Sequence, residues 1–126
     1  MAGSRLFQFR YSYERDLVDI FAKVTYGSSG APTLSQAKGV VSITRNSAGK
    51  YTLVLKDNFY LFMNMQNTQV VSSGAPAAPI FHVVSETVNA STKTIVIQFL
   101  SDASVATDPA SGEISLFHIT CRNAST

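Results

Sequence analysis

The chain has 126 residues, of which 45% are hydrophobic and only 14% charged, and its formal net charge is +2. This length fits one domain, and no apolar run approaches the roughly 20 residues of a transmembrane helix, so we expect no membrane partner. The chain starts with alternating polar and aromatic residues, so we expect no secretory signal. The single cysteine excludes an internal disulfide and a cysteine-rich zinc site. A surface rich in Ser and Thr with little charge provides little self-repulsion, which favours a protein that packs against neighbours.

The N-terminal segment alternates aromatic and polar residues, which places its rings on one side of an extended chain. Aromatic residues and arginine are enriched in interface cores. We therefore predict that residues 1–13 form an N-terminal strand or arm that contacts a neighbouring subunit. An ordinary first strand within the domain's own sheet remains the alternative. The predicted interface residues are Arg5, Phe7, Phe9, Arg10, Tyr11 and Tyr13.

Basic and aromatic residues together can also bind single-stranded nucleic acid. Here the arginines of this segment are balanced by Glu14, Asp16 and Asp19. We therefore expect no nucleic-acid partner.

Residues 14–24 fit two periods. Leu17, Ile20, Phe21 and Val24 are spaced as on one face of a helix. At period two, alternate residues from Val18 to Tyr26 share one face instead. We favour the strand, because the segment ends in β-rich residues and the following segments are strands.

The rest of the chain reads as strands separated by turn residues. A hairpin is predicted from 41–45 and 51–55, with Gly49 in its turn. A second hairpin is predicted from 80–84 and 94–100, and a closing strand from 114–121. The segment 59–71 has clear strand character only over 59–65. Loops are predicted over 27–36, 74–79 and 108–112, from their Gly and Pro residues. The pattern predicts an all-β chain, a single domain over residues 1–126 that forms a β-sandwich or barrel of about six to eight mainly antiparallel strands.

Catalytic and metal-binding motifs are missing from the sequence. His82 and His118 lie in predicted strands outside any metal-ligand spacing, and Cys121 follows His118 by three residues, on the opposite strand face. The segment from Asp102 to Asp108 has too few oxygen ligands for calcium and is expected to be a solvated loop. We therefore predict no catalytic residues, no cofactor, no metal and no enzymatic activity.

Three segments of the chain resemble small structural proteins of tailed bacteriophages. They are Ala22–Leu34, Gly39–Leu55 and the turn Ala106–Ile114 before the last strand. Among these proteins the chain is most like head decoration or cement proteins. The resemblance implies a virion protein on the outer head surface. Its partners would be other copies of itself, in a homotrimer, and the major capsid protein, whose adjoining subunits it would clamp against internal genome pressure.

Two alternatives stay open at this stage. A tail, baseplate or head-fibre component would have a similar sequence. A glycan-binding β-sandwich would need amides and an aromatic residue in one region, and the nearest candidates are Tyr60, Asn64, Gln66, Asn67 and Gln69.

Overall fold

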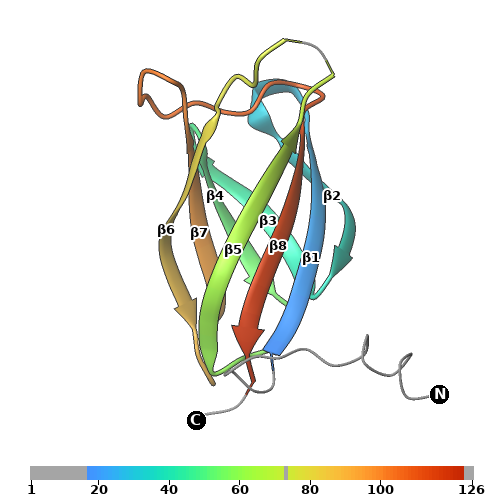
Figure 1. Ribbon diagram of the computed structural model, residues 1–126, viewed down its shortest axis with the longest axis vertical. Helices are drawn as coiled ribbons and strands as arrows, with labels where there is room; N and C mark the ends of the chain where they lie inside the picture. The colour runs from blue at the N-terminus through green and yellow to red at the C-terminus, as the bar shows by residue number, and fades with distance from the viewer. Residues whose placement is uncertain (1–16, 73, 124–126) are drawn as a thin grey trace, which may run out of the picture.

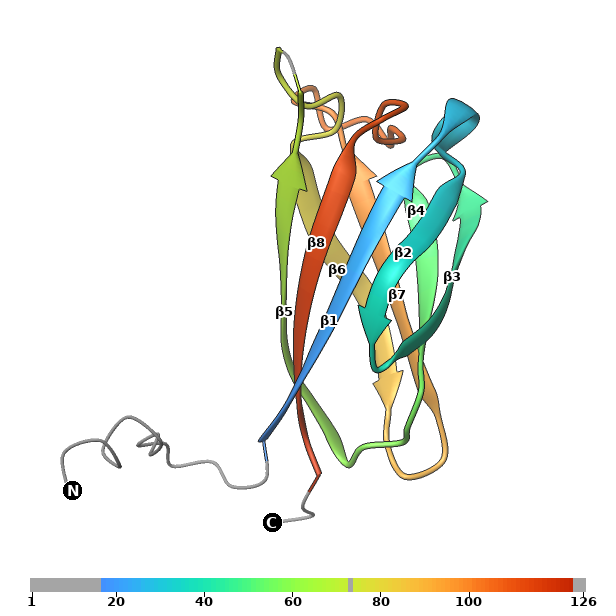
Figure 2. The ribbon, with the colours of Figure 1, turned by 90° about the vertical axis from the view of Figure 1, so that its right-hand side faces the viewer.

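The computed structural model describes residues 17–72 and 74–123, which form a β-sandwich of two four-stranded antiparallel sheets (Figures 1 and 2). The front sheet has the strand order β2-β1-β8-β5, and the back sheet has the order β3-β4-β7-β6. A 3₁₀ turn, η1, spans Ser28–Gly30. The strands are β1 (Leu17–Tyr26), β2 (Pro32–Lys38), β3 (Val40–Ser47), β4 (Lys50–Leu55), β5 (Leu61–Val70), β6 (Ile80–Val88), β7 (Lys93–Leu100) and β8 (Ile114–Arg122).

The predicted all-β fold is thus confirmed, and both predicted hairpins are present as β3-β4 and β6-β7. Gly49 lies in the turn of the first hairpin and has a φ of +71°, a conformation that favours glycine. The closing strand is β8, which pairs with β1 on one side and β5 on the other. In the part of the chain that the structure describes, no helix is long and apolar enough to cross a membrane.

The ambiguous segment is a strand over all of its described residues. β1 lies between β2 and β8, so its backbone groups find partners on both sides. Ile20, Ala22, Val24 and Tyr26 are buried, as the period-two pattern predicts. A helix would have left these neighbouring strands unpaired.

Three predicted boundaries are wrong, those of β2, β5 and β6, and β6 continues to Val88, past the predicted end at residue 84. β2 occupies Pro32–Lys38, where a loop was predicted over 27–36. Pro32 begins an edge strand, a position where a missing N–H is tolerated. β5 spans Leu61–Val70, whereas the predicted strand character is clear only up to Met65. β5 pairs with β8 through its backbone, and a strand with one solvent-facing side can do so without alternating apolar side chains.

Both sheets contribute rings to an aromatic cluster in the core. Phe99 in β7 is fully buried, and its ring lies edge-on to Tyr26 and Tyr51, with both pairs of ring centroids 5.9 Å apart. Phe81 in β6 packs against Phe99 at 5.3 Å and against Phe117 of the front sheet at 5.9 Å. This cluster packs the two sheets against each other.

All four edge strands carry an extra residue relative to their partner strand. Such β-bulges twist an edge and make edge-to-edge pairing with another chain unfavourable. Three of the bulge residues, Val41, Met63 and Val84, are large, apolar and exposed. The registers place the extra residues at Ser35 in β2, Val41 and Asn46 in β3, Met63 in β5 and Val84 in β6.

Candidate functional site

The six residues predicted for a subunit interface, from Arg5 to Tyr13, lie outside the residues that the structure describes. The chain enters the described fold at Leu17, which pairs with Arg122 of β8. The eight strands of the described residues lie after the predicted arm.

The two histidines do not come together with each other or with the cysteine. His82 is exposed on β6 of the back sheet, whereas His118 lies on the outer face of the front sheet. Cys121 points into the core, where burial and, to a lesser extent, the charge of Glu86 raise its pKa to about 11. Residues 17–72 and 74–123 contain no group of three His, Cys, Asp or Glu residues that could hold a metal ion.

The prediction that the segment from Asp102 to Asp108 is a solvated loop is wrong at Asp108, which is partly buried. Its carboxylate accepts two hydrogen bonds from Arg45, from Nε at 3.0 Å and Nη2 at 2.9 Å, and a third from the N–H of Gly49 at 2.8 Å. The hydroxyl of Tyr51 lies 3.2 Å away and donates to the carbonyl of Gly30 at 2.8 Å. Partial burial alone would raise the pKa of Asp108, but these donors lower it below the usual range. The cluster joins two loops to the β3-β4 hairpin and has a structural role.

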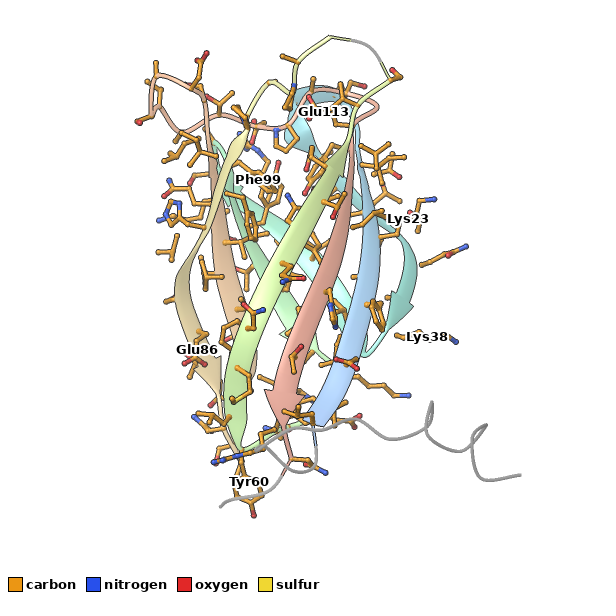
Figure 3. All side chains as sticks on the ribbon, viewed as in Figure 1. Lys23, Lys38, Tyr60, Glu86, Phe99 and Glu113 are labelled. Carbon is orange, nitrogen blue, oxygen red and sulfur yellow. The ribbon has the colours of Figure 1, made fainter. Side chains whose placement is uncertain are left out.

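A second polar network is buried at the upper end of the sandwich, where Figure 3 labels Glu113. The carboxylate of Glu113 accepts from Gln69 Nε2 at 2.9 Å and from the N–H groups of Ala77 at 3.1 Å and Ala110 at 2.9 Å. Ser115 donates to Gln69 at 2.7 Å and lies 3.0 Å from the hydroxyl of Tyr26. Burial raises the pKa of Tyr26 above the usual tyrosine range.

Ser115 is fully buried, so its hydroxyl is not accessible as a nucleophile. Both oxygens of Glu113 accept hydrogen bonds, one from Gln69 and one from loop backbone N–H groups, so this network connects loops to the front sheet. The sequence placed Glu113 beside a turn and contained no signal for its burial.

The amides proposed for glycan binding do not gather in one region. Asn64 and Gln66 are exposed, whereas Gln69 joins the Glu113 network, and Asn67 donates to Gln69 at 3.2 Å. Tyr60 precedes β5 at the opposite end of the sandwich from Glu113 (Figure 3).

The outer face of the front sheet carries two adjacent rows of side chains across its strands. One row runs from Lys38 through Phe21 and His118 to Gln66, and the next runs from Gln36 through Lys23 and Leu116 to Thr68. We call the depression over β2, β1 and β8 the front hollow. It has a volume of about 580 Å³, and it is bounded by Phe21, Lys23, Gln36, Lys38 and Leu116.

The ring of Phe21 is fixed at the border of the front hollow. It stacks on His118 with ring centroids 4.7 Å apart and an interplanar angle of 11°. His118 Nε2 lies 3.0 Å from Asp19 Oδ1, which holds the imidazole in place. Phe21 is nevertheless 52% exposed and Leu116 is 40% exposed.

The charge around the front hollow is positive. Lys23 and Lys38 project from the same side of the molecule (Figure 3), and neither forms an ion pair within residues 17–72 and 74–123. Asp19 is the one described carboxylate in the outer rows of this sheet, and it contacts His118. The front hollow therefore combines an apolar surface with two ammonium groups.

No protein-family model, no curated protein and no solved structure was found to match the chain. The likeness to phage structural proteins therefore stays a prediction from the sequence.

Proposed function

We propose that the chain is a non-enzymatic structural protein of a tailed-phage virion, and that it decorates the outer head surface by bridging major capsid subunits. The observation that carries the proposal is the outer face of the front sheet. Phe21, Leu61, Val70 and Leu116 are exposed there, although solvated faces of antiparallel sheets are usually polar. Phe21 and Leu116 lie in adjacent rows, and exposed apolar side chains that lie together mark interaction sites. The phage-like sequence segments support the same conclusion.

Self-association as a homotrimer is part of this proposal. The chain has few charges to keep copies apart, and a stable interface buries about 1,200–2,000 Å² in total. The bulged edges make strand pairing a poor route to assembly. The N-terminal arm and the outer face of the back sheet are therefore the surfaces that would meet in a trimer.

Copy number in the particle tests the location. We expect quantitative mass spectrometry of the purified virions that contain this chain to find it in numbers comparable to the major capsid protein. A tail, baseplate or head-fibre component would instead be present in a few copies, in proportion to tail proteins. Absence of the chain from purified particles would contradict both locations.

Deleting residues 1–13 tests the arm. Because every strand that the structure describes lies within residues 17–122, we expect the shortened chain to fold, with unchanged circular dichroism, but to lose trimer formation in analytical ultracentrifugation and binding to its particle. A full-length variant with Phe7, Phe9, Tyr11 and Tyr13 changed to serine should behave in the same way, because the rings supply the buried face.

The matched control changes Ser4 and Gln8 to alanine, which keeps the four rings, and should assemble normally. Unfolding of the deletion variant would assign the rings to the domain's own core. Normal assembly of that variant would make the segment dispensable. Either result removes the arm hypothesis.

A further inference from the structure

We propose that the front hollow is the docking site for an extended acidic segment of a different protein, which seats an apolar side chain against Phe21 and Leu116 and places carboxylates on Lys23 and Lys38. This inference deepens the proposed function, on which it rests, by naming a contact surface and the chemistry of the partner. The evidence is the position of these four residues in two adjacent rows of one sheet face.

The apolar half of the site is preorganised. Phe21 is clamped on one side by the imidazole of His118, which is itself bonded to Asp19. A side chain held in its binding geometry loses little conformational entropy when a partner arrives. Leu116 lies two residues from His118 on β8 and therefore diagonal to Phe21 across the two strands, so an aliphatic side chain resting on Phe21 would also meet Leu116.

The charged half of the site, Lys23 and Lys38, favours a partner with carboxylate groups. Lys38 is paired with Phe21 across β2 and β1, and Lys23 lies between Gln36 and Leu116 in the next row. The two ammonium groups thus flank the apolar surface, and the described residues provide no competing ion pair. Hydrogen bonds between ammonium and carboxylate groups are stronger than neutral ones, and complementary charge also speeds encounter.

A peptide fits this surface better than a glycan. A sugar buried against Phe21 and Leu116 would need partners for its hydroxyl groups, because unsatisfied buried polar groups are costly. The front hollow offers one amide, Gln36, and Asp19, the one described carboxylate in the outer rows of the front sheet, already accepts from His118. An aliphatic side chain has no such need.

The test is an NMR titration of the full, ¹⁵N-labelled chain with a blocked probe peptide of sequence Glu-Leu-Asp-Leu-Glu. We expect saturable shifts at Phe21, Lys23, Lys38 and Leu116, and no binding of the uncharged peptide Gln-Leu-Asn-Leu-Gln. The double variant Lys23→Gln, Lys38→Gln should bind the acidic peptide at least about tenfold more weakly, which corresponds to ~1.4 kcal/mol. The matched control, Lys50→Gln with Lys56→Gln, removes the same charge from the region of β4 and should bind normally.

Four results would overturn the inference. The first is that the acidic peptide causes no NMR shifts, or only shifts outside the front hollow. The second is equal binding of the uncharged peptide, and the third is tighter binding of an acidic trisaccharide at the same residues. The fourth is a changed oligomeric state of the Lys23→Gln, Lys38→Gln variant without peptide. The last result would mean that a second copy of this chain covers the face. The titration uses the isolated chain, so its failure is distinguishable from failure of the virion assignment, which depends on the copy number in particles.

Discussion

Replacing Phe99 with alanine is expected to lower the free energy of unfolding by about 3–5 kcal/mol, the usual cost of deleting a buried phenyl ring. Phe99 is fully buried in β7, and its ring contacts Tyr26 of the front sheet as well as Tyr51 and Phe81 of the back sheet. The deletion removes a large apolar surface and leaves a cavity between sheets that β-sheet backbones cannot easily close. Aromatic pairs add to the loss beyond the buried area.

Equilibrium denaturation in urea measures this loss as a lower midpoint of the unfolding transition, with an unchanged dependence of the unfolding free energy on urea concentration. Val105→Ala is the matched control, because Val105 is 60% exposed in a loop, and exposed changes usually stay within about 0.5 kcal/mol. If Phe99→Ala does not fold, Phe99→Leu keeps most of the volume and should lose about 1.5 kcal/mol or less. A loss under ~1.5 kcal/mol for the alanine variant would mean that the aromatic cluster does not join the sheets as the structure indicates.

The periodicity of the sequence predicts most of this fold. The buried faces of β1, β4, β7 and β8 all follow the period-two pattern, since these four strands are the inner ones of the two sheets and bury one face each. The errors fall on the edge strands β2, β5 and β6. An edge strand pairs on one side only, tolerates Pro32 at its start, and can carry polar residues such as Gln66, so its composition resembles a loop.

The candidate site was much less predictable. Asp108 and Glu113 contact residues that are 36 to 63 positions away in sequence, and no local pattern announces such pairs. The front hollow depends on the registers of β1 with β2 and β8, including the bulge at Ser35. A register shift of one residue would turn Phe21 into the core, and register across distant strands is not encoded in the periodicity of either strand alone.

Replacing Glu113 with alanine is expected to lower the free energy of unfolding by about 3 kcal/mol, because each buried donor left without an acceptor costs about 1–3 kcal/mol. Glu113 is 5% exposed, and its carboxylate accepts hydrogen bonds from Gln69 and from the backbone N–H groups of Ala77 and Ala110. The costs do not add fully, since a cavity of about 230 Å³ beside Glu113 offers room for water.

Glu113→Gln separates the loss of acceptors from the loss of volume. Glutamine fills the same space, but its amide nitrogen would face either a backbone N–H group or Gln69 Nε2, so one donor meets another donor. We expect it to retain one acceptor and to destabilise the chain by about half as much as alanine does, since one oxygen instead of two is lost. Asp102→Ala, in an exposed loop position, is the matched control and should leave urea denaturation unchanged. If both Glu113 variants are as stable as the unmodified chain, the carboxylate does not hold the segment of Ala77 and the turn of Ala110 against the front sheet.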